Sequence, residues 1–104
     1  MVRELKDNRW KEFSKAEYAV IDCCGENSFA CVQLAPIFDA AADELSGVSF
    51  GRINISLYPE IADTYGIDAM PTLLFFRNGG LVNRVVGSME SEDLFGELSR
   101  LLYE

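Results

Sequence analysis

Short apolar runs alternate with amphipathic stretches along this chain, and this alternation constrains the fold more than any other feature. Residues 18–24 form a nearly continuous apolar run, typical of a strand that is buried on both faces. Two further strand-like runs lie at residues 48–55 and 72–76, and helical stretches separate the three runs. Repeated strand–helix–strand units close with right-handed crossovers and place helices on both faces of a sheet. The pattern therefore predicts an α/β domain.

Capping residues predict where the first helices begin and end. Asp7 is the predicted N-cap of a short helix, which follows a weak strand at residues 2–5. Ser28 is predicted to cap a longer helix that runs to about Ser46, where Gly47 ends it. The first half of the chain is thus expected to read strand, helix, strand, helix.

Turn residues delimit the second half of the chain. Pro59 is expected to begin a short helix that ends at Gly66. The Asn-Gly-Gly sequence at residues 78–80 is a hairpin signal that joins the third apolar run to a strand at residues 81–86. Ser91, followed by two acidic residues, opens a final helix. Because a hairpin is antiparallel, the expected sheet is mixed.

Composition and charge exclude several classes of function. A length of 104 residues fits one domain, which we expect to span residues 1–104. The net charge of −8 argues against nucleic acids and anionic membranes as partners, because both require basic patches. No apolar run reaches the roughly 18–20 residues of a membrane span, and the polar N-terminus has no apolar signal region. We therefore expect a cytoplasmic protein that does not bind membranes.

The chain contains no histidine and three cysteines, Cys23, Cys24 and Cys31. Without histidine, a Ser-His hydrolase is excluded and the commonest metal ligand is missing. The spacing of the three cysteines is also poor for zinc, which needs four ligands. We expect neither a metal nor a cofactor.

Four features in order along the chain resemble the thioredoxin family over nearly its whole length. They are Asp22 at the position of the buried acid, Cys31 at that of the second active-site cysteine, the Ala35-Pro36 pair, and Met70-Pro71-Thr72 before a strand. None of these features is specific alone, but their joint order and spacing are. The resemblance implies a three-layer α/β/α sandwich with a central mixed five-stranded sheet, and a cis bond before Pro71.

The active-site loop departs from the family pattern, because Ser28-Phe29-Ala30-Cys31 stands where Cys-Gly-Pro-Cys is expected. Ser28 therefore occupies the position of the nucleophilic cysteine, and Asn27 replaces a tryptophan. A serine hydroxyl is far less acidic than a thiol and gains little without an adjacent base. The simplest interpretation of Ser28 is a helix N-cap.

Cys31 alone cannot complete thiol–disulfide exchange, which needs one thiol to attack a substrate disulfide and a second to resolve the mixed disulfide. Alternate residues of a strand share a face, so Cys24 is expected on the same side as Asp22 and Cys23 on the other. The resemblance places Asp22 beneath Cys31. We hypothesise a relocated Cys24/Cys31 dithiol; the alternative is that both cysteines are small buried apolar residues.

The remaining candidate site residues each have a functional and a structural interpretation. Asp22 is either a general base with a pKa raised by burial or a buried acid paired with Arg52. Met70, Pro71 and Thr72 are expected to bind an extended substrate, as the resemblance implies. Phe29 is either an exposed apolar contact or a packed residue of the first helical turn.

Three functions remain open on the sequence. The first is an atypical thioredoxin-like protein of cell redox homeostasis, which would exchange disulfides with protein thiols and receive electrons from a thioredoxin-reductase-like protein. The second is a redox-inert module that keeps the substrate groove, and the third is a scaffold that uses only the fold. Whether the chain is an enzyme is left open, and a monomer is expected.

Overall fold

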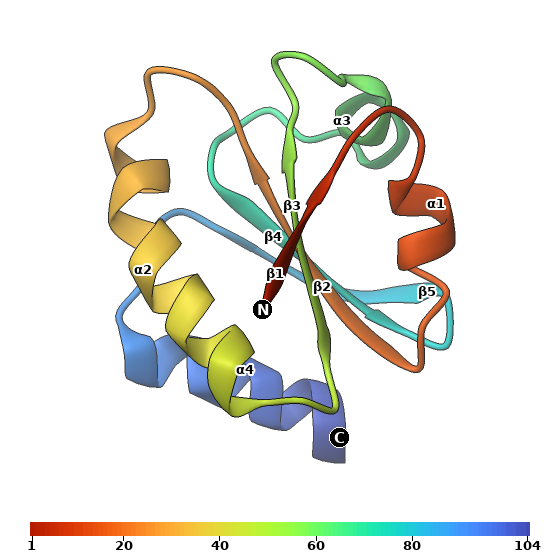
Figure 1. Cartoon of the computed structure of the whole chain (residues 1–104), viewed down its shortest axis with the longest axis vertical. Helices are drawn as coiled ribbons and strands as arrows, with labels where there is room; N and C mark the ends of the chain where they lie inside the picture. Colours follow the sequence, from red (N-terminus) through yellow and green to blue (C-terminus); the bar gives the residue numbers. More distant parts are fainter.

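The computed structural model describes residues 1–104, with the predicted order of strands and helices (Figure 1). In chain order the elements are β1 (Val2–Leu5), α1 (Trp10–Phe13), β2 (Tyr18–Cys24), α2 (Phe29–Glu44), β3 (Ser49–Asn54), α3 (Glu60–Tyr65), β4 (Thr72–Arg77), β5 (Gly80–Val86) and α4 (Ser91–Tyr103). None of the helices is both long enough and apolar enough to cross a membrane.

The five strands form one mixed sheet in the order β1-β3-β2-β4-β5. β1, β3 and β2 run parallel, whereas β4 is antiparallel to both β2 and β5. Cys23 near the end of β2 therefore pairs with Thr72 at the start of β4. This register brings the loop after β2 and the segment before β4 to the same end of the strands.

Helices cover both faces of the sheet, which confirms the predicted three-layer α/β/α arrangement (Figure 1). One core cluster lies between the sheet and helices α2 and α4, and includes Val20, Phe38 and Leu98. A second cluster, which includes Ile21 and Trp10, lies on the opposite face. Side chains of β2 alternate between the two cores, as a period of two requires.

The prediction that Asp7 caps the first helix is wrong. Asp7 has a φ of 54°, and α1 begins three residues later with Arg9 at its N-cap position. The Arg9 N–H donates to the Lys6 carbonyl at 3.1 Å, so the segment after β1 closes as a tight turn before the helix starts. Asp tolerates the left-handed region better than most residues, and here that property outweighs its capping preference.

One further helix boundary differs from the prediction. α2 ends at Glu44, with Leu45 at the C-cap position, rather than near Ser46. α4 begins at Ser91, as predicted, and its N-cap Glu90 forms a reciprocal capping box with Asp93. The Leu45 N–H donates to the Ala41 carbonyl at 3.0 Å at the end of α2, and the Glu90 N–H donates to the Asp93 carboxylate at 3.2 Å at the start of α4.

Other predicted boundaries are confirmed. Ser28 is the N-cap of α2, and Gly66 ends α3 in the left-handed conformation with a φ of 65°. In the β4–β5 hairpin, Asn78 and Gly79 have φ values of 51° and 87°, as a tight turn of this kind requires. β3 is one residue shorter at each end than the run at residues 48–55.

Candidate functional site

Two cysteines from neighbouring elements line one shallow pocket of about 540 Å³. Cys24 is the last residue of β2, and Cys31 lies in the first turn of α2. Both are 8% exposed. The short loop between β2 and α2 brings the two residues together, and Arg52 of β3 closes one side of the pocket.

Asp22 is fully buried beside this pocket, and its carboxylate accepts hydrogen bonds from two side chains. The Cys24 thiol donates to its Oδ1 at 2.8 Å, and Nε of Arg52 donates to its Oδ2 at 3.2 Å. Arg52 also donates to Asp39 of α2 at 2.9 Å. Burial raises the pKa of the Asp22 carboxyl, and the hydrogen bond from Cys24 and the charge of Arg52 offset only part of this rise.

The environment of Cys24 keeps its thiol protonated. Burial raises its pKa well above the usual range, and the nearby charge of Asp22 raises it further. The Cys31 thiol, which lines the same pocket, contributes to the same rise. All three cysteines are free thiols in the structure.

Cys23 points to the opposite face of β2, as its position in the strand predicts. It is fully buried in the core cluster that contains Trp10 and Ile21. Burial raises the pKa of its thiol above the usual range. Its environment is that of a packed apolar residue.

Ser28 uses its side chain to cap α2. Its Oγ accepts a hydrogen bond from the backbone N–H of Cys31 at 3.2 Å, and its backbone is extended, as is usual for an N-cap. Asn27 before it has a φ of 60°, which asparagine tolerates. The capping interpretation of Ser28 is therefore confirmed by geometry.

The mouth of the pocket is apolar. Phe29 is 75% exposed and Val32 is 68% exposed, one helical turn apart. Phe29 is thus an exposed side chain, and the alternative of a packed first-turn residue is wrong. Its first-turn position lies before the buried stripe of α2, which begins with Cys31.

Met70 packs against the active-site loop at Gly25. A Cβ atom at Gly25 would lie 2.5 Å from Met70 Sδ and 2.6 Å from Ser56 Oγ, so the glycine makes room for both side chains. The sequence did not reveal this contact, because Gly25 and Met70 are far apart in the chain. It links the segment before β4 to the loop that carries the cysteines.

Of the four residues predicted to bind substrate, only Phe29 and Met70 expose their side chains appreciably. The Met70–Pro71 peptide bond is cis, and Pro71 is buried. Thr72 is also buried, and its Oγ1 donates to the carbonyl of Ala69 at 2.8 Å. The Thr72 side chain therefore stabilises the turn before β4, and any contact it makes with a ligand is through the backbone.

The side chains do not form a metal site: no group of three or more Cys, Asp or Glu residues is arranged to hold an ion. Asp22, which is the nearest carboxylate to the cysteines, already accepts from Cys24 and Arg52. What the geometry provides is a pair of neighbouring thiols, one of them hydrogen-bonded to a buried carboxyl.

Comparison with known proteins identifies the family and the fold. The thioredoxin family model matches residues 1–100. The thioredoxin of Chlamydia caviae is 32% identical over 94 residues, which cover 90% of this chain and 92% of the relative. The thioredoxin of Chlamydia pneumoniae is 34% identical with the same coverage.

Solved structures show the same fold. A thioredoxin from Malassezia sympodialis superposes with a TM-score of 0.87 at 27% identity, over 96% of this chain and 90% of that one. A mutant thioredoxin from Halobacterium salinarum has a TM-score of 0.89 at 19% identity, over 96% and 89% of the two chains. The relatives point to thiol–disulfide redox chemistry as the general function. By its fold, the order of its sequence features and these similarities, the chain belongs to the thioredoxin family.

Proposed function

We propose that this protein is an atypical thioredoxin-like oxidoreductase in which Cys31 and Cys24 form the working dithiol and Asp22 accepts the proton of Cys24. The proposal rests on one observation. The Cys24 thiol donates to Asp22 at 2.8 Å and lines the same pocket as Cys31, so the second thiol that the exchange needs is present although Ser28 has replaced the usual one.

The raised pKa of Cys24 assigns the order of the two steps. Because this thiol is protonated at neutral pH, it is a poor first nucleophile, and the first attack falls to Cys31. In the family pattern that residue resolves the mixed disulfide rather than forming it. The replacement of the first cysteine by Ser28 is thus accompanied by a reversal of the role of Cys31.

The proposed reaction consists of two successive thiol–disulfide exchanges. The Cys31 thiolate attacks one sulfur of a substrate disulfide, forming a mixed disulfide and releasing the other sulfur as a thiolate. Cys24 then transfers its proton to Asp22 and attacks the Cys31 sulfur, which releases the second substrate thiolate. The protein is left with a Cys24–Cys31 disulfide, which an external dithiol reduces by the same exchange in reverse.

Asp22 suits the role of proton acceptor. Its Oδ1 already accepts the Cys24 proton in a hydrogen bond, and Arg52 holds the other oxygen at 3.2 Å. Burial raises the pKa of the carboxyl toward neutrality, which is where a general base works best. The ion pair with Arg52 orients the carboxyl, so both interpretations of Asp22 apply together.

The surroundings of the pocket suit a protein disulfide as substrate. Phe29, Val32 and Met70 offer apolar contacts to residues that flank the disulfide. The backbone beside Pro71 offers an edge for an extended chain. We propose protein disulfides as oxidants and a thioredoxin-reductase-like protein as the source of electrons, acting on a cytoplasmic monomer whose 104 residues form one domain.

Insulin reduction and trapping test the proposal together. We expect Cys31→Ser to abolish turnover, and Cys24→Ser to accumulate a mixed disulfide at Cys31 that mass spectrometry of the alkylated, unreduced protein detects. Cys23→Ser is the matched control and should retain activity. Three free thiols after oxidation of the native protein by a small disulfide would overturn the dithiol.

A redox-inert binding module is the second candidate, and the geometry of Ser28 favours it. The position of the usual nucleophile carries a hydroxyl that is engaged as a helix cap, and Cys31 is only 8% exposed. In that case a partner would bind at Phe29 and Met70 without turnover. Capture of the same partner by the wild type and by a variant that lacks all three cysteines would support this function over the first.

A further inference from the structure

The outer edge of β1 is unpaired. β1 is the end strand of the sheet and pairs only with β3, so its other side presents backbone N–H and C=O groups that no strand satisfies. The strand is short and carries two exposed charged residues, Arg3 and Glu4, at its centre. An open edge of this kind can accept an extended chain as an additional strand.

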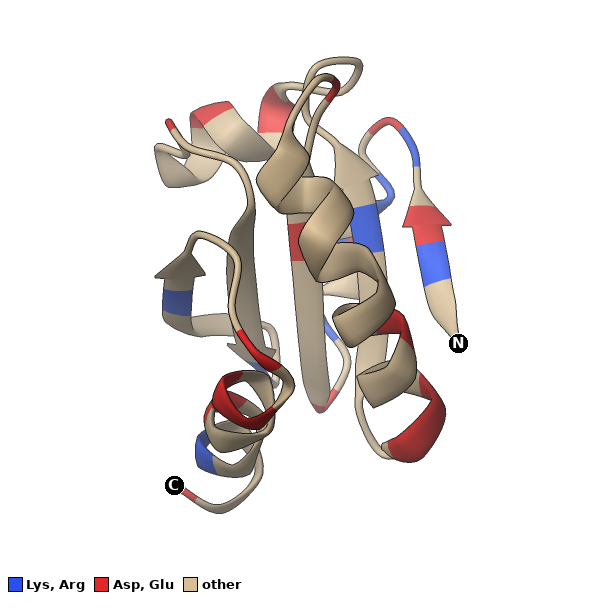
Figure 2. Cartoon of the chain, turned by 90° about the vertical axis from the view of Figure 1, so that its left-hand side faces the viewer, with Lys and Arg blue, Asp and Glu red and all other residues tan.

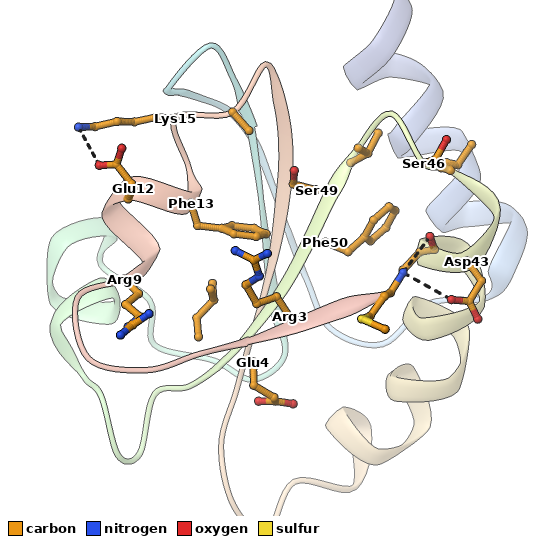
Figure 3. Close-up of a pocket in the computed structure, with 16 residues that line it drawn as sticks. Arg3, Glu4, Arg9, Glu12, Phe13, Lys15, Asp43, Ser46, Ser49 and Phe50 are labelled. Carbon is orange, nitrogen blue, oxygen red and sulfur yellow. Dashed lines mark hydrogen bonds and ion pairs between the residues drawn. The ribbon is translucent and has the colours of Figure 1, made fainter.

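A groove of about 970 Å³ lies along this edge and extends under α1. Leu5 and Phe13 contribute apolar lining, Arg3, Arg9 and Lys15 contribute positive charge, and Glu4, Glu12 and Asp43 contribute negative charge. Figure 3 shows Arg3 reaching toward Phe13, while Glu4 points to the opposite side of the strand. The groove shares no lining residue with the cysteine pocket.

The unpaired charges of the groove are positive, although the whole protein is acidic. The three acidic residues of the groove each lie within 4 Å of a cation: Asp43 of the N-terminal amine, Glu12 of Lys15 and Glu4 of Arg52. Five of the nine Lys and Arg residues lie in the first 15 residues, against three of the 17 Asp and Glu residues. In Figure 2, acidic segments dominate the helices, whereas the edge strand that carries the N-terminus shows one basic and one acidic segment. Lys15 is paired with Glu12 at 3.4 Å, whereas the side chains of Arg3 and Arg9 form no ion pair and no hydrogen bond.

A second copy of this chain does not suit the edge. When two strands pair antiparallel about a two-fold axis, residues that face each other lie on the same side of the sheet. Arg3 and Glu4 alternate in side, so in the two registers that overlap most of β1 the central pair is Arg3 with its own copy or Glu4 with its own copy. Like charges directly opposite each other destabilise a pair of strands.

We propose that the β1 edge binds an extended acidic segment of a partner protein as a sixth strand, with carboxylates on alternate residues facing Arg3 and Arg9. The backbone edge supplies the pairing, and the two unpaired guanidinium groups supply the selectivity for acid. This surface acts independently of the cysteines, and its failure would leave the proposed redox function untouched.

The test is titration of the full chain with a fluorescent peptide of about six residues, in which glutamate alternates with valine. We expect saturable binding that weakens as salt is raised, and no binding of the same peptide with lysine in place of glutamate. The double variant Arg3→Gln/Arg9→Gln should lose about tenfold in affinity. Arg100→Gln, an exposed arginine on α4, is the matched control and should bind normally.

Hydrogen exchange decides whether the peptide adds a strand. Bound peptide should slow exchange of the backbone amides at residues 2–5, and the Arg3→Gln/Arg9→Gln variant should lose that protection at the same peptide concentration. Binding without protection would mean charge attraction alone and would overturn strand addition. Protection that instead rises with protein concentration in the absence of peptide, with a doubled mass in light scattering, would replace the acidic partner by a second copy.

Discussion

Replacing Arg52 by methionine removes the one cation that contacts the buried carboxyl of Asp22. The side chain of Arg52 is 21% exposed, and its Nε lies 3.2 Å from Asp22 Oδ2. Methionine keeps an unbranched stem of similar length, so the apolar contact with Phe38, over whose ring the guanidinium lies at 5.6 Å, is largely retained. The substitution therefore measures the contribution of the positive charge of Arg52 separately from that of its packing.

The expected loss of stability is about 3 kcal/mol above neutral pH. Two unit charges 3.2 Å apart attract by about 5 kcal/mol at an effective dielectric constant of 20. Breaking such a buried pair costs about 3–5 kcal/mol, and partial exposure of Arg52 favours the lower end. The contacts with Asp39 and Glu4 add little, because both carboxylates are more than half exposed.

The loss should depend on pH with a definite sign. The folded-state pKa of Asp22 is raised, so between its unfolded value of 3.8 and that folded value the native state holds more protons, and the free energy of unfolding falls as pH rises. Without Arg52 the folded pKa is higher still, and the fall continues to higher pH. The difference between the two proteins should therefore widen with pH, by at most about 1.4 kcal/mol per unit.

Urea unfolding followed by the fluorescence of Trp10, the single tryptophan, measures this difference at a series of pH values from mildly acidic to mildly basic. For the double variant Asp22→Asn/Arg52→Met, the difference in unfolding free energy from the parent should not widen with pH, because the Asp22 carboxyl that titrates is gone. Arg100→Met, at a position 63% exposed, should stay within about 0.5 kcal/mol of the parent. A loss for Arg52→Met that is the same at every pH would refute the account of Asp22.

Three further substitutions separate structural from chemical roles. Ser28→Ala should lower the free energy of unfolding by about 1 kcal/mol through loss of the cap on the Cys31 N–H, as measured by urea unfolding. Ser28→Cys restores the family spacing with Cys31, and should increase insulin reduction over the parent; no increase would indicate that more than this residue has been lost. Phe38→Ala empties a fully buried site beside Phe50 and should cost about 3–5 kcal/mol by the same unfolding assay, and a loss below about 1 kcal/mol would contradict its placement.

Much of the fold could be predicted because its signals are local. The alternation of side chains along β2 placed Cys24 with Asp22 on one face and Cys23 on the other, and the structure confirms it. Ser28 was identified as a cap from its position before an amphipathic helix. The prediction for Asp7 is wrong because the same residue type suits both a cap and a left-handed turn, and sequence offers no way to weigh the two.

The candidate site was predicted in its members but not in its contacts. Sequence suggested that Arg52 pairs with Asp22, and the structure confirms the pair, but the sharing of Arg52 with Asp39 was not foreseen. Whether Phe29 is packed or exposed was also undecided. Its exposure depends on how α2 sits against the sheet, which local pattern does not report.

Local signals along the chain were enough to establish the strands, the helices, the Ser28 cap and the face on which each strand residue lies, because each depends on neighbours within a few residues. The register that sets Asp22 opposite Arg52, the packing of Met70 over Gly25 and the open edge of β1 came from tertiary structure. Asp22 and Arg52 are 30 residues apart, and their contact depends on how whole strands and layers pack. Such packing is a property of the complete fold, and no local pattern encodes it.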